Sequence, residues 1–228
     1  MTSISANIER VRLRIHDAET RYGRPPDSVL LLAASKARHA EEIRAATRAG
    51  LRHFGENYLQ DAAGKMDLLA DTGIVWHFIG PIQSNKTREI AGRFDWVHSV
   101  DRLKIARRLN MHRSAGAPPL NVCIQVNLAS EPTKSGVDAA GLPALAGEIA
   151  GMDRLRLRGL MAIPPRSPEP QIRQANFAAV RMALESLRGT GLELDTLSMG
   201  MSADLEAAIA EGATIVRVGT AIFGPRPK

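Results

Sequence analysis

The chain has 228 residues, of which 44% are hydrophobic and 24% charged, the composition of a globular protein with a large core. Its one cysteine, Cys123, excludes an internal disulfide and a multi-cysteine zinc site, and fits a reducing cytoplasm. No apolar run approaches the ~20 residues of a membrane span, and no signal-peptide core opens the chain. We therefore expect a cytoplasmic protein with no membrane partner.

The formal net charge of +6 and the pI of about 10.0 suit either nucleic acid or small anionic ligands. The basic residues, however, are interleaved with acids in helix-like segments, and only 4% of the residues are aromatic. Few rings could therefore stack on bases. We expect no nucleic-acid partner.

The first predicted element is an amphipathic helix over Ser5–Tyr22, which the Gly23-Arg24-Pro25-Pro26 stretch ends. After it, short apolar segments alternate with amphipathic ones. The apolar segments predict strands at Val29–Ser35, Arg52–Gly55, Trp76–Gly80, Trp96–Ser99, Leu120–Asn127, Leu157–Ile163, Thr196–Met199 and Ile215–Val218.

The segments between them predict helices at His39–Ala49, Leu59–Leu69, Asn85–Arg93, Arg102–Ser114, Ala139–Ala150, Pro170–Arg188 and Ala203–Glu211. Strands and helices that alternate in this number predict a single (β/α)8 TIM barrel with an extra N-terminal helix, one domain over residues 1–228. An open doubly wound sheet is the alternative, but no G-x-G-x-x-G follows the first strand.

Lys36 follows the first predicted strand, at the end of the barrel where the active sites of this fold lie. An amine nucleophile could be placed there, although an unperturbed lysine, with a pKa of about 10.4, is almost entirely protonated at neutral pH. Burial at a strand end, with cationic neighbours such as Arg38 or Lys134, would lower that pKa. A solvated lysine that begins a loop is the alternative.

The last two strand ends carry a pattern suited to an anion. Gly200 and Ser202 precede the helix predicted from Ala203, with Ser202 as its expected N-cap, and Gly219 and Thr220 follow the final strand. Backbone N–H groups, close-approach glycines and a hydroxyl suit a phosphate, which barrels often bind after strands seven and eight. Ordinary caps and turn glycines are the alternative.

Four other residues have weaker patterns. His77 could be a general base, but a strand-end histidine is more often packed and hydrogen-bonded. Cys123 is predicted to be an inert core thiol, and Glu56 and Asp101 are expected to pair with nearby basic groups. The six histidines show no metal-ligand spacing, so we expect no metal.

Seven stretches, in order over nearly the whole chain, resemble the YggS/PROSC family of pyridoxal 5′-phosphate (PLP) binding proteins, also called PLP homeostasis proteins. They are Leu32-Ala-Ala-Ser-Lys36, Phe54-Gly-Glu-Asn-Tyr58, Trp76-His-Phe-Ile-Gly-Pro-Ile-Gln-Ser-Asn-Lys86, Lys134-Ser-Gly136, Leu157-Arg-Gly-Leu-Met-Ala-Ile-Pro164, Leu197-Ser-Met-Gly-Met-Ser202 and Val216-Arg-Val-Gly-Thr-Ala-Ile-Phe-Gly224. The resemblance implies the fold-type III PLP barrel found in alanine racemase.

The resemblance also implies roles for individual residues. Lys36 would carry PLP covalently as an internal aldimine, and Ser202, Gly219 and Thr220 would hold the phosphate. Arg217, two positions before Gly219 and so on the same face of the strand, would point at the pyridine nitrogen. An arginine there opposes protonation of that nitrogen and weakens the ring as an electron sink. Three more residues would lie near the cofactor: Asn57, Met161 and Lys134.

A PLP racemase needs an acid/base group on each face of the cofactor. Lys36 can serve one face, and in alanine racemase a tyrosine from an additional domain of a partner subunit serves the other. The tyrosines of this chain are only Tyr22 and Tyr58. The resemblance therefore implies a carrier and regulator in intracellular PLP (vitamin B6) and amino-acid homeostasis, without a robust enzymatic activity.

Two alternatives stay open. A PLP-dependent amino-acid racemase or lyase would use Lys36 with Tyr58 or His77, and a PLP-free barrel would act on a phosphosugar. The expected partners are PLP itself and PLP-dependent apo-enzymes that accept it. A barrel without the dimerisation domain of the racemase is expected to be a monomer.

Overall fold

The computed structural model describes residues 3–127, 135–165 and 167–225. Its parallel strands follow one another in chain order around one closed barrel, and the last strand pairs with the first. The strands are β1 (Leu30–Ala34), β2 (His53–Glu56), β3 (Val75–Phe78), β4 (Trp96–Val100), β5 (Leu120–Val126), β6 (Leu155–Ala162), β7 (Thr196–Ser198) and β8 (Ile215–Val218). The end at which these strands finish is termed the mouth, and the end at which they begin is termed the base.

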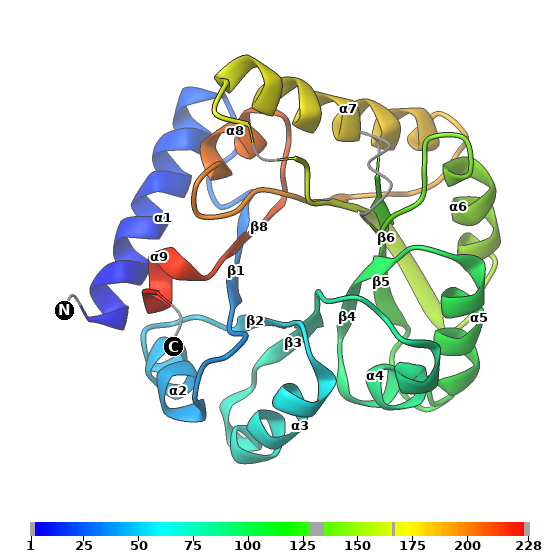
Figure 1. Cartoon of the computed structure of the whole chain (residues 1–228), viewed down its shortest axis with the longest axis horizontal. Coiled ribbons are helices and arrows are strands. Elements are labelled where there is room, and N and C mark those ends of the chain that lie inside the picture. Colours follow the sequence, from blue (N-terminus) through cyan, green and yellow to red (C-terminus); the bar gives the residue numbers. More distant parts are fainter. Residues whose placement is uncertain (1–2, 128–134, 166, 226–228) are drawn as a thin grey trace.

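Helices surround the barrel on its outside (Figure 1). They are α1 (Ile4–Arg21), α2 (Ala40–Arg48), α3 (Leu59–Leu68), α4 (Thr87–Arg93), α5 (Leu103–His112), α6 (Leu142–Ala150), α7 (Pro170–Arg188), α8 (Leu205–Ala210) and α9 (Thr220–Phe223), with 3₁₀ turns η1 (Ala70–Thr72) and η2 (Ser84–Lys86). The helix before the first strand, α1, packs beside α2, α8 and α9. The predicted (β/α)8 barrel with an extra N-terminal helix is confirmed.

Two of the differences from the sequence prediction lie at the start of β6 and after β8. Strand β6 begins at Leu155 rather than Leu157, because Leu155 still pairs with Leu120 of β5. The helix α9 is not predicted from the sequence, since four residues are too few to show an amphipathic period. Both differences lie at the ends of strands and leave the order of the barrel unchanged.

Alternate side chains of the strands face the helices and the barrel interior. The outward-facing residues pack against the helices in a large core that includes the fully buried Phe54 and Ile43. A separate, smaller apolar cluster of Leu32, Ile79 and Ile215 lies on the other side of the strands, inside the barrel. The rest of the interior is partly polar.

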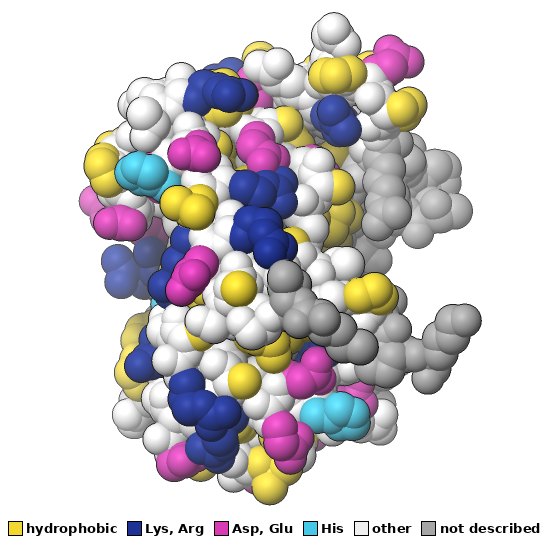
Figure 2. Space-filling model, turned by 90° about the vertical axis from the view of Figure 1, so that its left-hand side faces the viewer, with side chains coloured by type: hydrophobic (Ala, Val, Ile, Leu, Met, Phe, Trp, Pro, Cys, Tyr) yellow, Lys and Arg dark blue, Asp and Glu magenta, His cyan; other side chains and the backbone are white. Residues whose placement is uncertain are grey.

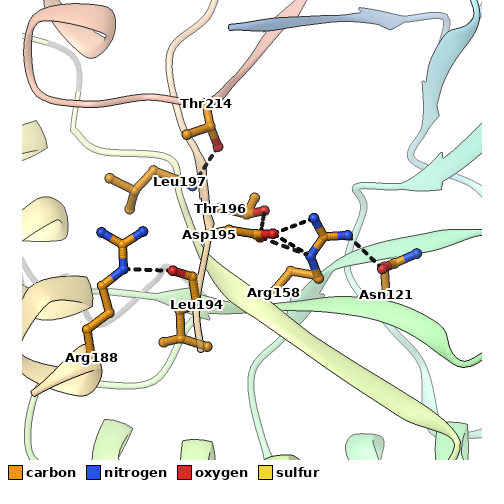
Figure 3. A network of polar contacts seen from close by, with 8 residues as sticks. All are labelled: Asn121, Arg158, Arg188, Leu194, Asp195, Thr196, Leu197 and Thr214. Carbon is orange, nitrogen blue, oxygen red and sulfur yellow. Dashed lines mark hydrogen bonds and ion pairs between the residues drawn. The ribbon is translucent and has the colours of Figure 1, made fainter. Parts of the chain in front are cut away.

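A polar network around the ion pair of Arg158 and Asp195 connects β5, β6 and β7 at the base of the barrel (Figure 3). Arg158 of β6 pairs with Asp195, with Nη2 at 2.6 Å from Oδ2, and donates to Asn121 Oδ1 of β5 at 2.9 Å. Its guanidinium lies 4.7 Å from the ring centroid of Trp96 of β4. Asp195 also accepts a hydrogen bond from Thr196 Oγ1 of β7. The charges of Arg158 and Asp195 are thus paired within the protein.

On the face formed by α1, basic and acidic side chains are interspersed (Figure 2). One ion pair there joins two helices, Arg14 of α1 and Glu206 of α8, with Nε and Oε1 2.7 Å apart. Among the described residues, no helix has the length and apolar character needed to cross a membrane.

Candidate functional site

A cavity of about 510 Å³ opens at the mouth of the barrel, at the ends of β1, β7 and β8. Five of the predicted site residues line it: Lys36, Ser202, Arg217, Gly219 and Thr220. They come from the two ends of the chain, and the pairing of β1 with β8 brings them together. Closure of the barrel therefore assembles these five residues around one cavity.

Lys36 is partly buried at the edge of this mouth cavity, two residues after the end of β1. Ala37 follows it with a φ of 57°, in the left-handed region that residues with a side chain rarely adopt. The hydroxyl of the preceding Ser35 donates to Glu56 Oε1 at 2.6 Å, and Lys65 Nζ lies 2.7 Å from the same oxygen. These contacts join the end of β1 to β2 and α3, and so fix the position of the backbone from which the Lys36 side chain extends.

The loop after β7 differs from the sequence prediction. The expected N-cap role of Ser202 is wrong, because α8 begins at Leu205 and Asp204 occupies the N-cap position. The Asp204 carboxylate accepts a hydrogen bond from the Met201 N–H at 2.6 Å, which makes a turn where a first helical turn was expected. Ser202 is therefore part of a loop at the cavity and not of a helix.

The hydroxyl of Ser202 connects this loop to the start of α9, since Oγ lies 3.4 Å from the N–H of Ala221. Within the described residues, the N–H groups of Ser202, Gly219 and Thr220 donate to no backbone carbonyl. Several N–H groups that converge on one cavity with a hydroxyl can bind an anion. The geometry is thus suited to a phosphate. The N–H groups of the loops provide this, and not the helix N-cap that was predicted at Ser202.

Arg217 of β8 is the most deeply buried cation at the cavity, with 5% of its surface exposed. Its Nη1 donates to Ser198 Oγ at 2.8 Å and also to the Ser198 carbonyl, while Nη2 donates to the Ala162 carbonyl at 2.8 Å. Burial lowers the pKa of Arg217 to about 10, so the guanidinium is still charged at neutral pH. It is a fixed positive charge held between β6 and β7.

The lining of the mouth cavity is predominantly cationic. Arg38 and Arg173 line it together with Lys36 and Arg217, whereas its one carboxylate is that of Asp204. Arg173 Nε is buried and has no hydrogen-bond partner among the described residues. Such a donor set suits a phosphate, and a primary amine at the same cavity suits an aldehyde. The residues present fit PLP, which carries both groups.

Of the other predicted site residues, the structure describes Asn57 and Met161. Met161 is fully buried in β6, opposite Ser198 of β7, and Asn57 follows β2; neither lines the mouth cavity. The buried Oδ1 of Asn57 has no hydrogen-bond partner among the described residues. Lys134 lies outside the described residues.

The weaker candidates have internal partners or are buried. His77 is packed and hydrogen-bonded, as predicted, and Cys123 is buried, which raises the pKa of its thiol to about 12. The expected ion pairs are present: Glu56 with Lys65 and Asp101 with Arg102. No group of three or more histidine, cysteine or acidic side chains in the described ranges could hold a metal ion.

Sequence reasoning assigned no role to His53, His98 and Ser198, which the structure connects to Arg217. His98 Nδ1 lies 2.8 Å from Ser198 Oγ, the atom that accepts from Arg217. Every second residue of a barrel strand faces the interior. That period, applied to all strands together, was the signal that could have identified these inward-facing polar residues.

Comparison with known proteins agrees with this geometry. Residues 3–227 match the model of the alanine racemase N-terminal domain. The chain is 58% identical over 226 residues to the pyridoxal phosphate homeostasis protein of Pseudomonas aeruginosa, which covers 99% of this chain and 97% of that protein. The chain belongs to the pyridoxal phosphate homeostasis protein family. The resemblance drawn from the sequence motifs is thereby confirmed.

Two kinds of solved structure are similar to this member of the pyridoxal phosphate homeostasis protein family. PipY of Synechococcus elongatus with PLP bound is 39% identical, with a TM-score of 0.85, over 97% of this chain and 100% of that chain. Alanine racemase from Corynebacterium glutamicum is 21% identical, with a TM-score of 0.69, over 99% of this chain and 61% of that chain. The second likeness shows the shared barrel fold.

Proposed function

We propose that this protein binds PLP reversibly, as a carrier and regulator of intracellular PLP and amino-acid homeostasis rather than as a dedicated enzyme. The mouth cavity carries the proposal, because it combines Lys36, the buried Arg217 and the backbone N–H groups of Gly219 and Thr220. The likeness to PipY with PLP bound supports the same ligand.

PLP, when bound, supplies an aldehyde that reacts with amines and a ring that withdraws electrons. In our proposal Lys36 Nζ is the point of covalent attachment, while Ser202, Gly219 and Thr220 bind the phosphate. Arg217 donates toward the ring nitrogen and, as a fixed cation, opposes its protonation. Three further proposed contacts are Asn57, Met161 and Lys134.

The positions of the acid/base candidates favour binding over turnover. A racemase or lyase needs a second proton-transfer group beside Lys36. Tyr58 is 61% exposed and does not line the mouth cavity. His77 is buried inside the barrel with both ring nitrogens in hydrogen-bond contact with other histidines. Neither side chain is placed to exchange protons at the cavity.

The absorption spectrum of protein purified with added PLP tests cofactor attachment. We expect a band of protein-bound PLP, and borohydride reduction should fix the group on the peptide that contains Lys36, as shown by mass spectrometry. Lys36→Ala should lose both signals, whereas Lys104→Ala, at an exposed lysine of α5, should keep them. Wild-type protein without the band would overturn PLP binding and favour a phosphosugar-binding barrel.

Turnover assays test the carrier role. A panel of D- and L-amino acids is incubated with the PLP-loaded protein, and racemised or cleaved products are measured. We expect no sustained conversion. Conversion over many turnovers that is lost in Lys36→Ala but retained in Lys104→Ala would overturn the carrier role and establish an enzyme.

A further inference from the structure

A line of hydrogen-bonded polar side chains crosses the interior of the barrel. His53 Nδ1 lies 3.0 Å from His77 Nε2, and His77 Nδ1 lies 2.9 Å from His98 Nε2. His98 Nδ1 lies 2.8 Å from Ser198 Oγ, which accepts a hydrogen bond from Arg217 Nη1 at 2.8 Å. Consecutive contacts therefore connect Arg217 at the mouth cavity with His53. These five residues are termed the histidine line.

The strand register shows that the histidine line rises from the base toward the mouth. His53 is the first residue of β2, and Gly55, two residues later, pairs with His77 of β3. His77 pairs with Trp96 of β4, so His98 lies one inward-facing position nearer the mouth. The next link crosses the interior from β4 to β7, strands that are not neighbours in the barrel.

The two ends of the histidine line reach two separate cavities. His53 is partly buried and lines a second cavity, of about 820 Å³, between the base of the barrel and α1. Arg217 lines the mouth cavity. His77 and His98, between them, are fully buried. These two buried rings therefore form a polar connection between the two cavities.

Arg217, together with the need of the Ser198 hydrogen for an acceptor, favours one direction for the hydrogen bonds of the line. A guanidinium only donates, so the Ser198 hydroxyl accepts from it and has its own hydrogen to give to His98 Nδ1. A neutral imidazole that accepts at Nδ1 carries its proton at Nε2. His98 then donates to His77, and His77 donates to His53. In the opposite direction the Ser198 hydrogen would have no acceptor among the described residues.

The surroundings keep the inner rings neutral. Burial lowers the pKa of His98 to about 3, with the charge of Arg217 acting in the same direction, and holds the pKa of His77 well below its usual value. Trp96 stacks on His77, with ring centroids 5.4 Å apart and planes inclined by 15°. Each inner ring therefore holds one proton and makes one donated and one accepted hydrogen bond.

We propose that Ser198 and His98 are positioning residues for Arg217, and that the histidine line couples the hydrogen bonding of Arg217 to His53 at the base. Loss of one hydrogen bond of the histidine line leaves a buried donor or acceptor unpaired. A reversal of the tautomers along the line would give that group a partner again. The effect on a bound cofactor rests on the proposed function, whereas the line itself does not.

The first test is ¹⁵N NMR of histidine-labelled protein freed of PLP, which identifies the protonated nitrogen of each ring. We expect the proton on Nε2 in His53, His77 and His98 at neutral pH. A proton on Nδ1 of His98 would overturn the proposal. This measurement needs no variant and so does not depend on how a substitution folds.

The second test changes the far end of the line. His53→Phe removes the last acceptor, so we expect His98 to become a mixture of tautomers although it does not touch residue 53. His53→Gln keeps an acceptor oxygen and should keep the single tautomer. His16→Phe, at an exposed histidine of the same base cavity, should have no effect. An unchanged His98 spectrum in His53→Phe would overturn the coupling.

The third test concerns positioning at the cofactor. In protein loaded with ¹⁵N-labelled PLP, Ser198→Ala should shift the ring-nitrogen signal, because Arg217 loses a side-chain partner that holds its guanidinium. An unchanged signal would overturn the positioning role. If the wild-type protein binds no PLP, the proposed function fails, whereas the tautomers measured without PLP still decide whether the line exists.

Discussion

The base and the mouth of the barrel use their cations in opposite ways. At the base, Arg158 contacts Asp195 and the ring of Trp96, so its charge is matched within the protein. At the mouth, several cations line one cavity with a single carboxylate, that of Asp204, and this already accepts from the Met201 N–H. The base closes the fold, and the mouth presents charge to a ligand.

This difference shows that the ratio of cations to carboxylates, more than the number of charged residues, distinguishes the mouth from the base. A guanidinium paired with a carboxylate adds a modest stabilisation and has little field left at a distance. Cations that outnumber the carboxylates in the lining of one cavity leave a positive potential that attracts an anion. Changes at the base should therefore alter stability, and changes at the mouth should alter binding.

The largest loss of stability is expected at Gly159 of β6, beside Arg158. Its φ is +154°, and an added Cβ would lie 1.9 Å from the Thr196 carbonyl oxygen of the neighbouring strand. Gly159→Ala should lower the free energy of unfolding by about 4 kcal/mol or more, because two strand backbones cannot separate locally. Denaturant unfolding measures this loss.

The matched control for that change is Gly147→Ala in α6, where no atom lies within 4 Å of the new Cβ. We expect this variant to gain about 0.5–1 kcal/mol, since alanine is the better helix former. If Gly159→Ala were as stable as the wild type, the close packing of β6 against β7 would be contradicted.

The next largest effect is a loss of stability in acid. We expect it to originate at His98, which lies between the base and the mouth of the barrel. Its folded pKa of about 3 lies below the ordinary value of 6.5, so between these pH values the unfolded chain binds more protons than the folded one. The contribution of the neutral His98 to the free energy of unfolding is complete above pH 6.5 and is lost as the pH falls toward 3. Well inside that window the loss is about 1.4 kcal/mol for each pH unit.

Urea unfolding as a function of pH tests this origin. His98→Gln should flatten the dependence by up to about 1.4 kcal/mol per pH unit, the contribution of one proton. Met111→Ala, at an exposed residue whose side chain does not titrate, should leave the slope as it is. A slope that is the same in His98→Gln and the wild type would refute a neutral, buried His98.

A smaller loss is expected from the base ion pair. Arg158→Met should lower the free energy of unfolding by about 1–2 kcal/mol, because Asp195 loses charged hydrogen bonds but is partly exposed to water. The affinity of the folded protein for PLP, measured by absorbance titration, should not change. A weaker affinity would break the separation between base and mouth.

The smallest effect is the salt dependence of PLP association. The cationic lining of the mouth cavity should steer the phosphate, so raising the ionic strength from about 0.05 M to about 0.5 M should slow association by a few-fold. Stopped-flow absorbance measures the rate. Pyridoxal, which lacks the phosphate, is the control and should show little salt dependence; an equal effect on both ligands would contradict steering.

Much of the fold could be predicted because it depends on local period and order. Apolar runs alternating with amphipathic segments were enough for the barrel. The N-cap at Ser202 was predicted wrongly because Asp204, two residues later, is an equally good capping residue and also closes the turn onto Met201. Local propensity could not choose between the two.

The sequence by itself determined the order of the strands, most of the helices and the positions of Lys36 and Arg217 near strand ends, because these follow from patterns within a few residues. Only the tertiary structure decided which polar side chains meet inside the barrel. His98 and Ser198 are 100 positions apart in the chain, and no local pattern carries that distance. Their contact exists because closure of the barrel places the inner faces of β4 and β7 opposite each other.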